Sequence, residues 1–237
     1  MDKVSASIQP VIYRHRLPVR VMHWINVVCV FILLMSGLNI FNAHPALYWG
    51  HESPATKPLM QITNDGEHGL LRVGGAEIHT TGVLGLSRVA GEKEYSARAF
   101  PAWATVPGPQ WLAMARVWHF FFAWVFVING FAYLLYTVFS GHLRRDLVPS
   151  KKEFRGIGAS IKQHLLLRHP HGEDARRYNV LQNIAYLSIV FVVLPMIVVG
   201  GWAMSPMMDS FAAGWVDWLG GRQGLRTLHF TGAALLV

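Results

Sequence analysis

Residues 116–139 read RVWHFFFAWVFVINGFAYLLYTVF, a run that begins with Arg116 and contains no further Asp, Glu, Lys or Arg. A helix needs about 20 mainly apolar residues to cross a bilayer, so this run is long enough to do so. Residues 21–51 and 178–208 are equally free of these charged side chains. We therefore predict that each of the three runs forms a membrane-spanning helix.

Together these runs predict an all-α integral membrane protein folded as a four-transmembrane-helix bundle. The fourth helix would begin near residue 225, and because the chain stops at residue 237 it is expected to be truncated about half-way across the bilayer. Pro195 lies inside the third run and should kink that helix. One membrane domain, 1–237, is expected, with spans at about 19–42, 111–139, 180–203 and 225–237, an outer loop at 43–110 and an inner loop at 140–178.

The net charge of +8 is concentrated in two segments. Segment 1–20 has four Lys or Arg and one acid, and segment 141–177 has nine and four, whereas segments 43–116 and 203–226 are balanced. With four spans both basic segments lie on one side, which the positive-inside rule identifies as the cytoplasm. We expect a multi-pass membrane protein with a cytoplasmic N-terminus. Topology and contact with anionic membrane lipid explain the charge, and nothing else supports a nucleic-acid partner.

An arginine stands three residues before a histidine at the polar edge of three apolar runs. Residues three apart share a face of an α-helix and differ in depth by about 4.5 Å. The arginine can then reach the headgroups while the histidine lies just inside the membrane. A b-type haem needs such a pair, because an imidazole binds its iron and its propionates face water. The pairs are Arg20 and His23, Arg116 and His119, and Arg226 and His229.

The topology sorts these histidines into two levels. His119 and His229 each open a span that starts outside, so they lie at one depth and can supply both axial ligands of one haem. His23 lies at the inner end, where His142 is a poor second ligand because it falls at or past the headgroups. A better partner would lie about 20 Å along span four from His229, beyond Val237. Two haems b are therefore expected, the inner one without its second ligand in this chain.

Other interpretations of these polar residues remain open. An intramembrane histidine can be a hydrogen-bonded core residue, whereas zinc would need four closely grouped ligands. Asn179 and Gln182 share one helical face at the inner end of span three, where their amides could bind a quinone carbonyl. Capping by Asn179 and an interfacial Gln182 explain the spacing better when it is taken alone.

The outer loop contains a hairpin pattern. Residues 70–73 and 76–79 flank Gly74 and Gly75, which predicts two short strands joined by a two-glycine turn. A loop of this length is usually functional. Docking of an extracytoplasmic partner and a cap packed on the bundle are equally compatible with its length.

The motifs resemble those of the bacterial cytochrome b561 superfamily, most closely the di-haem cytochrome b membrane subunits of hydrogenases, formate dehydrogenases and related respiratory enzymes. Phe100-Pro101-Ala102-Trp103 and residues 140–146 resemble the branch associated with molybdopterin oxidoreductases. The motifs that carry the main resemblance are Arg20-Val-Met-His23-Trp24-Ile-Asn26, Arg116-x-x-His119, Asn179-x-x-Gln182 and Arg226-x-x-His229-x-x-Gly232.

This resemblance implies a bundle with two b haems stacked across the membrane. It places His119 and His229 on the outer haem and His23 on the inner one. It also implies a quinone site beside the inner haem, where Asn179 and Gln182 match the family's positions. The departure is the family's last histidine, which would fall beyond residue 237.

The expected function is electron transfer between an extracytoplasmic redox subunit and the membrane quinone pool through two haems. The partner would be of the molybdopterin, iron–sulfur or hydrogenase type, and the chain itself would not be a catalytic subunit. Two other classes are compatible with the composition: a non-redox membrane anchor subunit, and a small transporter that uses intramembrane histidines as proton relays.

Overall fold

The computed structural model describes residues 16–54, 57–88, 94–141, 143, 148–149, 154–166, 180–211 and 214–237. Three helical segments are long and apolar enough to cross a membrane: α1 (Leu17–Phe41), α2 (Leu112–Phe139) and a segment over Val180–Ala203. Their bounds lie within two residues of the runs expected at 19–42, 111–139 and 180–203. The chain is therefore a mostly helical, multi-pass membrane protein.

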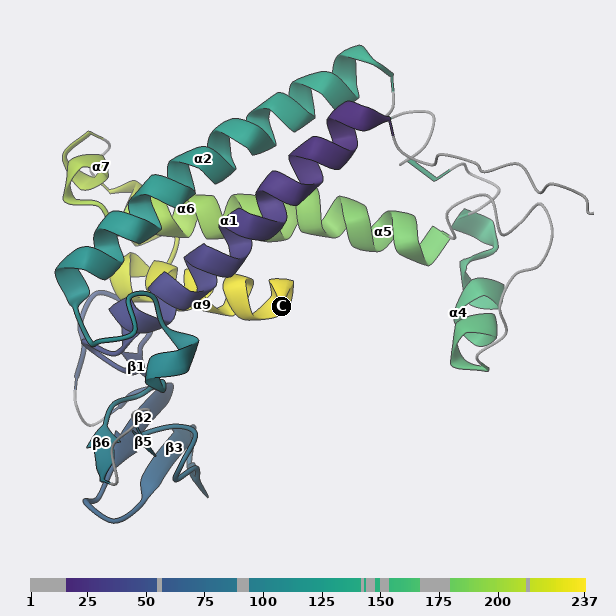
Figure 1. Ribbon diagram of the computed structural model, residues 1–237. Coiled ribbons are helices and arrows are strands. Elements are labelled where there is room, and N and C mark those ends of the chain that lie inside the picture. The colour runs from purple at the N-terminus through teal and green to yellow at the C-terminus, as the bar shows by residue number, and fades with distance from the viewer. Residues whose placement is uncertain are drawn as a thin grey trace, which may run out of the picture.

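Helices α1 and α2 run side by side along much of their length (Figure 1). An amide pair joins them near the middle: Asn129 of α2 donates through Nδ2 to the Asn26 Oδ1 atom, at 2.7 Å, and to the Met22 carbonyl, at 2.8 Å. Inside a membrane such polar side chains need partners, so the two helices satisfy each other.

The third segment consists of α5 (Val180–Ser188), one π-helical turn (Ile189–Val193) and α6 (Leu194–Ala203). The π turn ends two residues before Pro195. Proline lacks an N–H and its ring clashes with the carbonyl four residues earlier, which here is that of Phe191. The disturbance expected at Pro195 is therefore seen as a π-helical turn, in which the backbone hydrogen bonds span five residues instead of four.

Helix α9 (Gly221–Leu236) packs against α6 through glycines. A Cβ atom on Gly232 would come within 2.7 Å of Ile197, and one on Gly200 within 3.0 Å of His229. Such close approach is typical of helix pairs in membranes. The helix begins four residues before the expected residue 225. The remaining described helices are short: α4 (Ile157–Leu165), α7 (Pro206–Phe211), α8 (Trp215–Trp218) and a 3-10 turn at Ala102–Ala104.

The expectation of an all-α protein is too simple, because the outer loop is a folded β unit below one end of α1 (Figure 1). Four strands form an antiparallel sheet in the order β1-β2-β3-β4, and β5 pairs with β6. Val73 pairs with Ala76 across the two-glycine turn, so β3 and β4 form a hairpin. The bounds are β1 (Ala46–Leu47), β2 (Met60–Asn64), β3 (Gly69–Val73), β4 (Ala76–His79), β5 (Leu86–Arg88) and β6 (Tyr95–Ala97).

The β unit is fastened to the helices by a small core. Phe41 at the end of α1 is buried with Leu47 and Ile62 of the sheet, and its ring lies 4.7 Å from that of Phe230 in α9. Buried Arg98 donates to the carbonyls of Phe100 and Gly108 and to Thr105 Oγ1, which fixes the return to α2. The outer loop thus caps this end of the bundle, which we call the sheet end.

Candidate functional site

His119 of α2 and His229 of α9 face each other at the sheet end. Their ring centroids are 6.1 Å apart and the ring planes are inclined by 63°. Both side chains are only partly accessible. The structure therefore brings together two of the three histidines that the motif singled out, although they are separated by more than a hundred residues of chain.

Each ring is oriented through its Nδ1 atom. His229 Nδ1 lies 2.7 Å from the carbonyl oxygen of Ile197, so it carries the proton and donates it. His119 Nδ1 lies 3.0 Å from Ser36 Oγ. That hydroxyl already donates its hydrogen to the Ile32 carbonyl at 2.7 Å, so it accepts from the imidazole. In each ring the proton is on Nδ1 and the free lone pair is on Nε2. A metal-binding imidazole is arranged in the same way, because one nitrogen binds the metal while the other is hydrogen-bonded.

Glycines make room for both rings. A Cβ atom on Gly37 would lie 3.3 Å from His119 Cε1, and one on Gly201 would lie 3.3 Å from His229 Cε1. A Cβ atom on Gly200 would meet the His229 Cβ atom and the Leu225 carbonyl at 3.0 Å. Gly200 and Gly201 both lie in the third run, and the structure shows that His229 fills the space beside them.

This geometry fits a metal held between two imidazoles. Two Nε2 atoms at about 2 Å on opposite sides of one metal place the ring centroids about 6 Å apart. The described residues contain no group of three or more His, Cys, Asp or Glu that could hold a metal ion. A haem needs only two protein ligands, because its porphyrin supplies the other four nitrogens. The residues present therefore fit a bis-histidine haem.

The three arginines differ in their contacts. Arg226 donates to the carbonyls of His44, at 2.6 Å, and Ala46, at 3.1 Å, and lies over the Phe41 ring. It thus ties α9 to the outer loop, a role that the motif did not predict. Arg116 is exposed above the Phe120 ring, and Arg20 is exposed at the other end of the bundle.

His44 lies beside this contact and outside the spans. Its ring stacks on Tyr48, with centroids 5.6 Å apart. Partial burial and, secondly, the nearby Arg226 charge lower the pKa of His44 below its ordinary value. The motif did not single out His44, so its position beside Arg226 was not foreseen.

His23 is not brought to the paired histidines. It lies thirteen residues before Ser36 in α1, which corresponds to about 20 Å along the helix. The side chain is exposed, and its ring contacts that of Trp24. Among the described residues no other histidine ring contacts it. The separation agrees with two levels in the membrane.

Only one of the two candidate quinone-binding residues, Gln182, lies in the described part of the chain. Asn179 lies outside the described residues. Gln182 is exposed on α5, whereas its neighbour Asn183 is buried and its Oδ1 atom has no hydrogen-bond partner among the described residues. Sequence spacing gave no reason to choose Asn183, because a buried amide is recognised only from packing.

A separate apolar groove of about 530 Å³ lies along α1 and α2. Arg20, Trp24 and Cys29 line it together with Phe122. The lining includes neither His119 nor His229, so the groove is distinct from the two-histidine site. We take the paired imidazoles, rather than this groove, as the centre of the chemistry, because the lining of the groove contains no histidine.

The fold defines a multi-pass helical membrane protein in which two imidazoles from different helices face each other at the sheet end. The chain belongs to the prokaryotic cytochrome b561 family, whose profile matches residues 14–237. This confirms the resemblance seen in the motifs. Membership implies that the protein binds haem b and acts as a membrane electron-transfer subunit.

One relative adds detail. The chain is similar to the YedZ1 protein of Azospira oryzae, which is named as a subunit of a protein-methionine-sulfoxide reductase. The two are 28% identical over 222 residues, which cover 92% of this chain and 81% of the relative. No solved structure matches the chain significantly.

Proposed function

We propose that His119 and His229 are the two axial ligands of one haem b, and that electrons enter or leave the protein through this centre. The observation that carries the proposal is the 6.1 Å separation of the two ring centroids at one depth. The hydrogen bonds to Nδ1 support it, because they leave Nε2 of each ring to the metal.

The residues around the site have separable tasks. Ser36 and the Ile197 carbonyl hold the imidazole planes and tautomers, and by accepting from Nδ1 they make each ring a stronger donor. Gly37 and Gly201 let the rings lie against helix backbone. Haem supplies one-electron redox chemistry when bound. The protein's contribution is ligand geometry and an apolar surrounding, which together set the reduction potential.

We also propose a second haem at the level of His23. The distance of about 20 Å along α1 would let electrons cross the membrane between two centres. Among the described residues no second histidine ring contacts His23, so a second axial ligand would have to come from another part of the chain or from a partner. A quinone site at Asn179 and Gln182 would then receive or supply electrons at the same end.

The sheet end would face a redox partner outside the cytoplasm. The charge distribution supports this orientation, because the basic segments at 1–20 and 141–177 belong to the opposite side. It makes the N-terminus cytoplasmic in a bacterial inner membrane. The relative is named as a subunit, which supports a partner for this chain too. Molybdopterin, iron–sulfur and hydrogenase-type subunits all fit the chemistry.

The test of the haem centre is the reduced-minus-oxidised visible spectrum of the purified protein. His119→Ala and His229→Ala should each remove the contribution of the proposed haem. The matched control is His51→Ala, which changes an exposed outer-loop histidine. A spectrum without a b-type band in the unmodified protein would favour the anchor or the proton-relay function. Retention of the full band in both site variants would refute the ligand assignment.

The quinone site is tested independently of the haem. Gln182→Leu should slow electron exchange between reduced haem and added quinone while haem content stays unchanged. Asn183→Leu is the informative comparison, because that neighbouring amide is buried. Equal quinone kinetics in the unmodified protein and the Gln182 variant would contradict a role for Gln182.

A further inference from the structure

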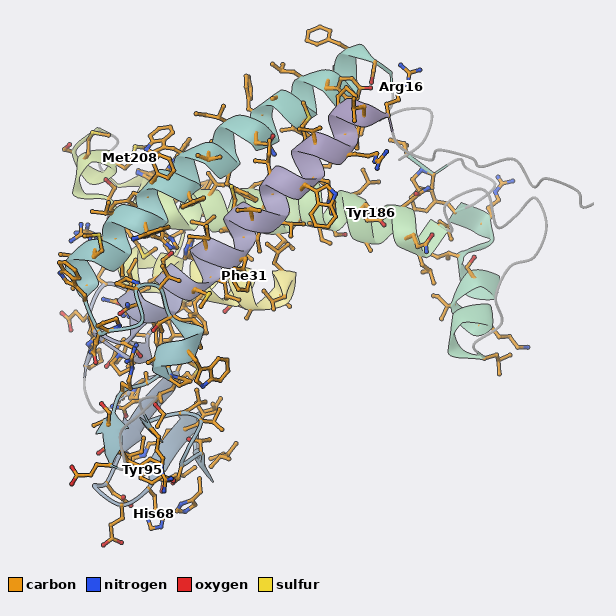
Figure 2. All side chains as sticks on the ribbon, in the orientation of Figure 1. Arg16, Phe31, His68, Tyr95, Tyr186 and Met208 are labelled. Atoms are coloured by element: carbon orange, nitrogen blue, oxygen red, sulfur yellow. The ribbon has the colours of Figure 1, made fainter. Side chains whose placement is uncertain are left out.

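A second pair of histidines lies in the β unit, away from the membrane helices. His68 precedes β3 and His79 ends β4, and their rings meet with centroids 5.2 Å apart at an angle of 88°. Figure 2 places His68 at the tip of the β unit farthest from the helices. Its side chain is about half exposed, with a relative accessibility of 49%. Nothing in the haem proposal uses this pair.

A carboxylate stands behind one of the rings. Asp65 Oδ2 lies 3.5 Å from His68 Nδ1. The other carboxylate oxygen accepts the backbone N–H groups of His68, at 2.7 Å, and Glu67, at 3.0 Å, so its position is fixed. A carboxylate on Nδ1 favours the tautomer with its proton there, which leaves the Nε2 lone pair for a metal.

The backbone beneath the pair is firmly held. Thr80 donates its N–H to the Gly69 carbonyl at 2.7 Å, and Gly69 donates to Thr81 Oγ1 at 2.9 Å. His79 is paired with Leu70 in the β3–β4 ladder. Gly69 has no space for a Cβ atom because the backbone at Leu84 and Leu86 packs against it. The two imidazoles are thus presented by a rigid support, as a binding site requires.

We propose that His68 and His79 together bind a divalent late transition-metal ion, with water completing its coordination. Two imidazole nitrogens at about 2 Å, with a near-tetrahedral angle at the metal, place ring centroids about 5 Å apart. Imidazole suits Zn²⁺ and Cu²⁺, and Cu²⁺ binds such sites more tightly. The described residues contain no cluster of three or more protein ligands, so this site is open and exchangeable.

The experiment uses the full-length, haem-loaded protein in detergent, with Zn²⁺ and Cu²⁺ as probes in equilibrium dialysis. The expected result is binding of one ion that His68→Ala and His79→Ala each weaken by at least about tenfold. His51→Ala is the matched control. His51 is also exposed and lies 3.4 Å from a carboxylate oxygen, that of Asp217, but it is not part of the pair. It should leave the affinity unchanged.

Asp65→Asn tests the carboxylate separately. The amide oxygen can still accept the two backbone N–H groups, so the turn is retained while the charge behind His68 is removed. The affinity should fall by less than in either histidine variant. The haem spectrum of every variant reports that the fold is intact. Metal affinity that is unchanged in both His68→Ala and His79→Ala, or equally reduced by His51→Ala, would overturn the proposal.

Discussion

The two ends of the helical bundle each begin a span with Arg-x-x-His, yet they are built differently. At the sheet end His119 meets a second imidazole, and the Nδ1 atom of each ring has a partner. At the other end His23 is exposed on α1. The difference shows that the motif marks the depth of a histidine. A ligand site also needs a facing helix and a hydrogen bond that orients the ring.

Packing explains why the sheet end supplies both the facing helix and the hydrogen bonds that orient the rings. Glycines at positions 37, 200 and 201 bring α1 and α6 close to the rings, and the β unit fixes the ends of α1 and α9 through the core around Phe41. An imidazole whose orientation is fixed before the cofactor binds loses less conformational entropy on binding. Haem binding should therefore follow this difference between the two ends.

The largest effect is expected from filling the space beside His229. Gly200→Val would place side-chain atoms against the His229 Cβ atom and the Leu225 carbonyl, where even a Cβ has only 3.0 Å. Such overpacking typically costs about 1–3 kcal/mol, and it should displace the ring and greatly lower haem content. Gly130→Val is the control, because nothing lies within 4 Å of a Cβ at Gly130. Haem-to-protein ratio after purification is the measurement. Equal losses in both variants would mean that any valine in a span is harmful.

His23→Ala should have a smaller effect than His119→Ala in the same assay. If the ends are independent, removing His23 takes away at most one haem per chain and leaves the spectrum of the His119–His229 centre unchanged. Quantification of haem per chain, together with the reduced-minus-oxidised spectrum, measures this. Complete loss of haem in the His23 variant would show that the two ends assemble cooperatively, which would contradict their independence.

Features that depend on composition along a single segment were predictable. The charge-free runs located the helices because a bilayer demands apolar length, and their spacing is visible without tertiary structure. The matched depth of His119 and His229 followed from counting spans and charges. The two-glycine turn likewise gave the place of the β3–β4 hairpin, because such turns depend on local backbone conformation.

Features that depend on which groups meet across the fold were not predictable. Ser36 is one polar residue among many in the spans, and only the packing of α1 on α2 places it at His119. The extent of the β unit was missed because its strands are short and are stabilised by the cap on α1 and α9. The role of Arg226 was missed for the same reason, since the carbonyls it binds lie about 180 residues away in sequence.

Arg226→Gln examines how the β unit supports the sheet end. Glutamine can replace at most part of the two hydrogen bonds to the carbonyls of His44 and Ala46. Since hydrogen bonds from charged donors contribute about 1.5–3 kcal/mol each, a loss of about 1–3 kcal/mol in stability is expected. Thermal unfolding and the rate of proteolysis within the outer loop measure it. Arg116→Gln is the control, because Arg116 is exposed. An equal loss of stability in both variants would assign the effect to charge at the membrane surface rather than to the carbonyl contacts.

The smallest effect is expected at Ser36, because a change there alters how strongly His119 donates to the iron and not whether it binds. Ser36→Ala removes the group that accepts from His119 Nδ1, so the imidazole becomes a weaker donor and stabilises oxidised iron less. A hydrogen bond worth about 0.5–1.5 kcal/mol corresponds to a rise of about 20–60 mV in the midpoint potential for one electron. Potentiometric titration of the purified protein measures the shift, with unchanged haem content showing that the ligand is retained. Ser36→Thr keeps the hydroxyl and should restore the original potential. If the alanine variant has an unaltered potential, His119 is oriented by packing against Gly37 and α1 alone, and the hydroxyl has no electronic role.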